Sequence, residues 1–163
     1  MRLIPVLNLV HVVAAFWFVS GVIGRGIVLR AAARAVDVRA ADALVRVAGH
    51  FEAMVRIPSI VVVGFGLLSA WRGGWPILGF LQGGSVNWIL ASLVLSLTLV
   101  PLIVWVFLPR GRVFEEALRN ALEEGRVTPA LTAAFHDPVV AAGHVWELIV
   151  IALVVALMVT KPF

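Results

Sequence analysis

Four long apolar runs, separated by short polar stretches, dominate the pattern of hydrophobic and polar positions along the chain. They cover residues 4–29, 50–70, 86–108 and 139–160. A helix needs about 20 apolar residues to cross the hydrocarbon core of a bilayer, and each run reaches that length. The pattern therefore predicts an all-α integral membrane protein, a four-helix bundle that forms a single membrane domain over residues 1–163.

The polar stretches between these runs carry signals of their own. Residues 30–47 mix alanines with regularly spaced charges, which favours a helical connection into the second span. Residues 71–85 are rich in glycine and indicate an interfacial loop. In residues 112–125 apolar side chains recur at helical intervals against charged ones, which predicts an amphipathic helix on the membrane surface between spans three and four. Asp137 and Pro138 are typical of a helix start, so the last span should begin there.

Composition and charge support lipid as the main solvent. Hydrophobic residues make up 62% of the chain and charged residues 13%, against roughly 25% charged in soluble domains. The net charge of +4 is explained by arginines at the ends of spans, so no nucleic-acid partner is expected. The absence of cysteine excludes disulfides, thiolate metal sites and a cysteine nucleophile.

The distribution of basic residues predicts the orientation in the membrane. Nine arginines lie at or near one end of the predicted bundle, and three basic residues lie at the other. The first group is Arg25, Arg30, Arg34, Arg39, Arg46, Arg110, Arg112, Arg119 and Arg126, and the second is Arg2, Arg72 and Lys161. Because arginine-rich ends face the cytoplasm, we expect a multi-pass protein of the inner or plasma membrane with both termini outside the cytoplasm.

Candidate functional residues are the polar side chains that lie inside apolar spans, where a charge costs at least ~2.5 kcal/mol. They are His11, Arg25, His50, Glu52, Arg56, His144 and Glu147. All except His11 fall in the inner half of the membrane or at its interface. The pattern predicts an ion pair of Arg56 with Glu147 or Glu52. Such a network either staples helices together or holds a polar ligand or cofactor.

The histidines suggest a metal or haem site. His50 and His144 lie at similar depths on the second and fourth spans and could clamp a haem iron between them. His11 has no histidine at its own depth, so it could give only five-coordinate iron or a site that another group completes. Arg25 and Arg30 are candidate donors to haem propionates, although the positive-inside bias alone would also place arginines there. Each histidine has an alternative interpretation as a hydrogen bond between helices.

Small residues on three of the spans leave room for close helix contacts or for a flat porphyrin face. These are Gly21, Gly24, Gly26, Gly64, Gly66 and Gly143. Close packing between helices is the commoner use of glycine in membranes. Such faces would also permit a homo-oligomer.

Motifs in three spans resemble the HemJ-type protoporphyrinogen oxidases and the related CopD-like membrane proteins. The first span resembles their first helix in its His, Trp, small residue and Arg, and the second in a Met-x-Arg-x-Pro sequence. The last span resembles the HemJ C-terminus, with a Glu and a closing Lys-Pro-Phe. The matching residues are His11, Trp17, Gly21, Arg25, Met54, Arg56, Pro58, Glu147, Lys161, Pro162 and Phe163. The third span departs from HemJ, because it lacks that family's Lys.

The resemblance implies haem b binding, with His11 as the leading ligand candidate. His50 and His144 have no counterpart in that family and are metal candidates because of their depth in the spans alone. The resemblance also implies an oxidoreductase that takes hydrogens from a porphyrinogen and passes electrons to an acceptor. Arg25, Arg56 and Glu147 would serve the propionates or handle protons. Two alternatives stay open, a CopD-like copper transporter and a non-catalytic assembly subunit. Copper(I) prefers sulfur ligands. The chain has three methionines and no cysteine, which argues against the copper transporter.

Overall fold

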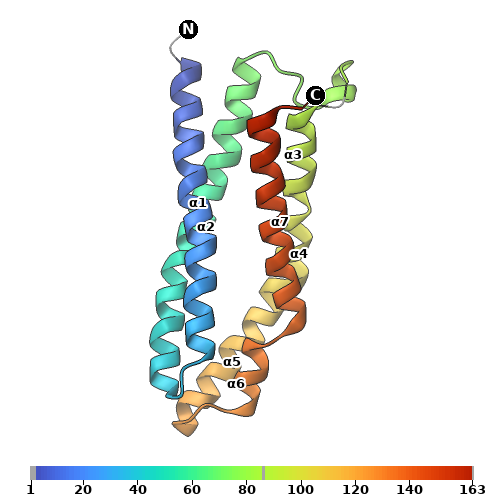
Figure 1. Ribbon diagram of the computed structural model, residues 1–163. Coiled ribbons are helices and arrows are strands. Elements are labelled where there is room, and N and C mark those ends of the chain that lie inside the picture. The colour runs from blue at the N-terminus through green and yellow to red at the C-terminus, as the bar shows by residue number, and fades with distance from the viewer. Residues whose placement is uncertain (1–2, 86, 163) are drawn as a thin grey trace.

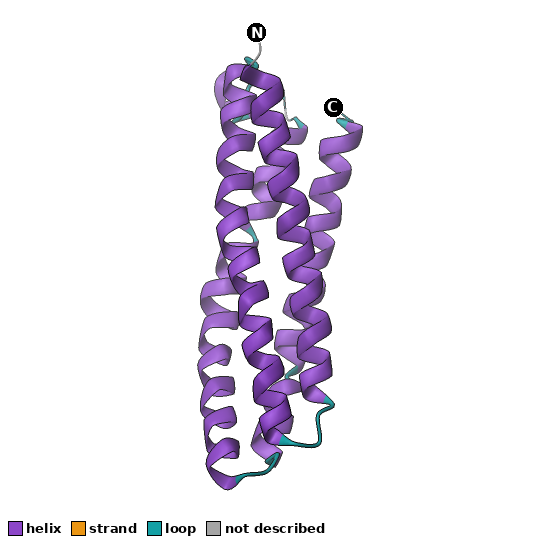
Figure 2. Cartoon of the chain, turned by 90° about the vertical axis from the view of Figure 1, so that its left-hand side faces the viewer, coloured by secondary structure: helices purple, strands orange, loops and turns teal. Residues whose placement is uncertain are grey.

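The protein is a bundle of long helices, described here from a computed structural model over residues 3–85 and 87–162 (Figure 1). Four helices in this part of the chain are long and apolar enough to cross a membrane, and none of its residues forms a strand (Figure 2). The predicted all-α class is confirmed. Arg2, Phe163 and Val86, at which the third span was predicted to start, lie outside the described residues.

The first two crossings are α1 (Leu3–Ala33) and α2 (Val38–Arg72). The charged stretch between the predicted spans is shared between their ends, so both helices are longer than the apolar runs alone. Asp37 caps the start of α2 and accepts a hydrogen bond from the backbone of Ala40, which satisfies an otherwise unpaired amide at the helix start.

The third crossing is irregular although its segments follow one another directly. It comprises α3 (Trp88–Leu97), α4 (Leu99–Leu102), a π-helical turn η2 (Ile103–Phe107) and α5 (Leu108–Glu124). Pro101 has no amide hydrogen and cannot bond the Leu97 carbonyl, which explains the break at Thr98. The loop before α3 contains a short 3₁₀ helix, η1 (Gly79–Gln82).

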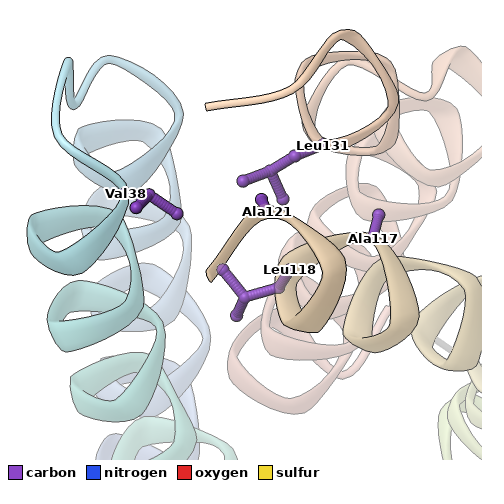
Figure 3. Packing of buried hydrophobic residues seen from close by; sticks show 5 residues of the cluster. All are labelled: Val38, Ala117, Leu118, Ala121 and Leu131. Carbon is purple, nitrogen blue, oxygen red and sulfur yellow. The ribbon is translucent and has the colours of Figure 1, made fainter. Parts of the chain in front are cut away.

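The predicted amphipathic helix is α5, the last segment of this crossing, and no loop separates it from η2. Ala117, Leu118 and Ala121 on its apolar face form a small core with Val38 of α2 and Leu131 (Figure 3). Leu131 belongs to α6 (Pro129–Phe135). This face of α5 is therefore covered by protein, and its position on the membrane surface stays a prediction.

The last crossing, α7 (Pro138–Thr160), begins where the sequence predicts. Asp137 accepts hydrogen bonds from the amides of Val139 and Val140, and it forms an ion pair with Arg110. Partial desolvation raises the pKa of the Asp137 carboxyl, but the hydrogen bonds from Arg110 and the two amides outweigh it and leave the pKa below its ordinary value.

The helices are arranged as two pairs, α1 with α2 and α3 with α7 (Figures 1 and 2). The pairs approach each other at the end of the bundle that carries α5 and α6, where α5 contacts α2 and α6 contacts α1. Both ends of the described chain lie at the opposite end of the bundle (Figure 1).

Glycines let the paired helices pack closely. A Cβ at Gly21 would lie 3.0 Å from the backbone of Met54, and one at Gly66 would lie 2.9 Å from the His11 ring. Gly24 lies against the Phe51 ring in the same way, and Gly143 lies against Phe107. These four glycines serve helix contacts, whereas a Cβ at Gly26 or Gly64 would meet nothing within 4 Å.

Candidate functional site

Arg25 joins three helices through its two terminal nitrogens. Its Nη1 donates to Glu52 Oε2 of α2 at 2.6 Å, and its Nη2 donates to Glu147 Oε2 of α7 at 2.8 Å. The side chains of Arg25 and Glu147 are 11% and 10% exposed, whereas that of Glu52 is 51% exposed. A guanidinium suits this position because it offers several donors in one plane.

The predicted pairing of Arg56 with Glu147 or Glu52 is wrong. Both carboxylates bind Arg25, and in the described parts of the chain Arg56 makes no ion pair. The reason is the depth of Arg25. Because α1 extends to Ala33, Arg25 lies two turns inside the helix, at the level of Glu52, and can reach both acids.

His144 extends this group of charges, which we name the Arg25 cluster and define as Arg25, Glu52, Glu147 and His144. His144 Nδ1 lies 3.2 Å from the Glu147 oxygen that also binds Arg25. A neutral His144 that donates through Nδ1 leaves Nε2 as an acceptor. The cluster then holds two carboxylates against one guanidinium.

The ring of His144 stacks on Phe107, with centroids 4.7 Å apart and an interplanar angle of 26°. Phe107 is the last residue of the π-helical turn, and the small Gly143 gives its ring the space it occupies. Sequence reasoning missed this contact. Pro101, six residues earlier, was the available signal that the third crossing is irregular.

His11 lies apart from the Arg25 cluster and binds the neighbouring helix. Its Nδ1 is 2.8 Å from the carbonyl oxygen of Val62 in α2, and its ring rests against Gly66. Fourteen residues separate it from Arg25, which is about 21 Å along a helix. Arg25 therefore cannot serve a group that His11 holds directly.

His50 and His144 are not brought together as the predicted pair of iron ligands in this structure. His50 is exposed, and its Nδ1 lies 3.0 Å from the carbonyl oxygen of Arg46 in its own helix. It precedes Glu52 by two positions and so projects about 200° away from it. Since Glu52 binds Arg25, His50 projects away from the side of α2 that contacts the Arg25 cluster.

Haem, the cofactor that the resemblance implies, can be tested against these side chains. His11 and His144 each have Nδ1 against an oxygen, the usual second contact of a metal-binding histidine, so Nε2 suits iron. Arg25 does not suit propionates, because both terminal nitrogens already bind carboxylates. A cavity beside it, lined by Glu52, Ala48 and Gly49 among others, measures only about 190 Å³. No group of three or more metal-ligating side chains occurs in the described chain.

The fold and its buried charges define a polytopic integral membrane protein whose helices contact lipid. A family model described as "Predicted integral membrane protein (DUF2269)" matches residues 5–162, and the chain belongs to this family. No curated protein matches the chain. No solved structure matches it either.

Proposed function

We propose that the protein binds haem b and acts in electron transfer or porphyrin oxidation, and that His11 would hold the iron. One observation carries the proposal. The Val62 carbonyl holds His11 Nδ1 at 2.8 Å, which orients the imidazole and leaves Nε2 for a metal. The resemblance of the first and last spans to HemJ-type oxidases supports the same cofactor.

A bound haem would supply a one-electron redox centre within the membrane. The protein's part is to hold and orient it. Gly66 lets the His11 ring lie between α1 and α2. The hydrogen bond to the Val62 carbonyl would increase the basicity of the imidazole and so its strength as a ligand of iron.

His144 is the second candidate ligand, because the Glu147 carboxylate holds its Nδ1. A carboxylate partner makes an imidazole a stronger ligand than a carbonyl does. His144 and His11 lie on helices of different pairs. We therefore treat His144 as an alternative ligand and not as the partner of His11 on one iron.

The proposal includes an orientation of the protein in the membrane, and two alternative functions remain to be distinguished from it. The arginine-rich end that includes α5 would face the cytoplasm, with both termini outside. A copper transporter of the CopD kind would bind copper and no haem. An assembly subunit would bind neither, and the Arg25 cluster would then serve only to hold helices together.

An absorption spectrum of the detergent-purified protein, oxidised and after dithionite, tests the proposal. We expect a Soret band that is lost in His11→Ala and retained in His144→Ala, His50→Ala and the control His136→Ala, a change at an exposed residue. Loss in His144→Ala alone would move the ligand to the Arg25 cluster. A colourless wild-type protein that takes up no haem on reconstitution would overturn the proposal.

A further inference from the structure

We infer that the cavity beside Arg25 holds the ammonium group of an ethanolamine phospholipid, with Glu52 as its anionic partner. The inference does not depend on haem and concerns a second ligand. It starts from the charge of the Arg25 cluster, in which Glu52 and Glu147 share a single guanidinium. With His144 neutral, the cluster carries one negative charge in excess, and a charge inside a span needs a counter-ion or a path to water.

Glu52 is the carboxylate of the cluster that a cation from outside can reach. Its side chain is 51% exposed, whereas that of Glu147 is 10% exposed. The hydrogen bond from Arg25 uses Oε2 of Glu52, which leaves Oε1 for a second donor. Glu52 also lines the cavity of about 190 Å³. A cation that balances the excess charge would therefore bind in this cavity.

The walls of the cavity determine which class of cation it suits. Apart from the Arg25 and Glu52 pair they are apolar, and they comprise Leu29 of α1 with Val45, Ala48 and Gly49 of α2. A metal such as Ca²⁺ takes about six to eight oxygen ligands, which one carboxylate does not supply. A primary ammonium donates hydrogen bonds to a carboxylate while its alkyl stem lies against apolar walls. Gly49 leaves room for that stem, because a Cβ there would meet nothing within 4 Å.

The depth of the cavity points to a lipid headgroup as the source of the ammonium. Leu29 is the last residue of the first apolar run, and Glu52 is the third residue of the second. Val45 precedes the second run by five residues, which is about 7.5 Å along a helix. The headgroup layer on each side of the hydrocarbon is roughly 5–8 Å thick. The cavity therefore spans the boundary between hydrocarbon and headgroups, where ethanolamine phospholipids present a primary ammonium.

Phosphatidylethanolamine and phosphatidylcholine with identical acyl chains form the test pair. They differ only in the three methyl groups that remove the N–H donors of choline. Native mass spectrometry of the detergent-solubilised protein, incubated with an equimolar mixture, counts the bound copies of each lipid. We expect the wild-type protein to prefer the ethanolamine lipid by roughly tenfold, as one charge-assisted hydrogen bond allows.

Three variants locate the preference. Glu52→Gln should remove it, because the amide carries no charge. Gly49→Leu should also remove it, because the new side chain fills the cavity and leaves the charges in place. Gly64→Leu is the matched control, since Gly64 is another glycine of α2 at which a Cβ would meet nothing within 4 Å. It should keep the preference of the wild type.

Several results would overturn the inference. Equal binding of both lipids by the wild type would show that the excess charge is balanced in another way, such as a proton on His144. A preference that survives in Glu52→Gln or in Gly49→Leu would place the lipid outside the cavity, and its loss in Gly64→Leu would implicate added bulk on α2 instead. Full competition by ethylammonium chloride at the concentration of the lipid would indicate a site for soluble amines. The Soret band tests the haem proposal separately from all of these.

Discussion

Arg25 donates to carboxylates of two other helices, and neither its own side chain nor that of Glu147 is more than 11% exposed. Removal of the guanidinium would leave Glu147 as a buried anion with only His144 beside it. Replacing one partner of a buried pair costs far more than the pair contributes, because the remaining charge keeps its desolvation penalty.

Arg25→Met is therefore expected to destabilise the protein by about 3–5 kcal/mol, measured by reversible unfolding in mixed detergent micelles. Glu52→Gln is the matched control, since its side chain is 51% exposed and its loss should cost about 1 kcal/mol or less. The double variant Arg25→Met with Glu147→Gln should recover part of the stability. Equal effects of Arg25→Met and Glu52→Gln would contradict this account.

Gly66 provides a second test, of the close contact between a glycine and the His11 ring. A methyl group there would lie 2.9 Å from the His11 ring, so Gly66→Ala should displace the ring and weaken its bond to Val62. We expect a loss of about 1–3 kcal/mol in unfolding free energy. Gly64→Ala, where the new methyl meets nothing within 4 Å, should be neutral or slightly stabilising. Similar results for the two variants would show that His11 adapts freely.

The sequence identified the polar residues that matter but not all their partners. A charged side chain inside an apolar run is easy to recognise because it costs free energy to place there. Arg25, Glu52 and Glu147 were found in this way. Their pairing depends on the relative depth and rotation of helices, and that depends on how far α1 continues beyond its apolar run.

Among the helices, α7 is the one whose first turn depends most clearly on a charged side chain. Asp137 caps two amides and binds Arg110. Its pKa is lower in the folded protein than in the unfolded chain, so its contribution to stability is present above the unfolded value of about 3.9. That contribution is lost as the pH falls through the folded pKa.

Thermal unfolding of Asp137→Asn as a function of pH measures this contribution. At pH 7 the variant should be less stable than the wild type, because the amide keeps the cap but loses the ion pair. The difference should shrink as the pH falls below about 4. A difference that stays constant from pH 7 to pH 3 would show that the charge of Asp137 contributes nothing.

Helix starts were predictable because their signals are local, as the cap at Asp137 illustrates. The π-helical turn at Ile103–Phe107 was not, because an apolar run looks the same whether its hydrogen bonds follow an α or a π pattern. Pro101 indicates a break but does not reveal which way Phe107 turns. The ring contact with His144 belongs to tertiary packing.

At the scale of the whole molecule, the number of crossings was predictable and their pairing was not. Hydropathy counts spans well because the bilayer fixes their length. The same lipid makes most helix faces equally apolar, so hydrophobicity does not tell which helix lies beside which. Small residues and buried charges decide that, and glycine contacts such as Gly21 against Met54 join α1 to α2.

The orientation of the molecule can be tested with single cysteines, since the chain has none of its own. Leu81→Cys in η1 and Glu123→Cys in α5 both alter exposed positions, at opposite ends of the bundle. In intact cells a membrane-impermeant maleimide should label the first and not the second, because basic residues favour the cytoplasm. The reverse pattern would place both termini inside.

The pairing of α1 with α2 has a consequence for how the molecule is made. A ribosome releases the first two crossings before the last, so their glycine contacts can form while the rest of the chain is still being translated. Arg25 meets Glu147 only after the final crossing has entered the bilayer. Until then Arg25 has only Glu52 as a partner, and one terminal nitrogen of its guanidinium lacks a carboxylate. Chaperones that survey membrane insertion would have this unpaired donor by which to distinguish unfinished chains from complete ones.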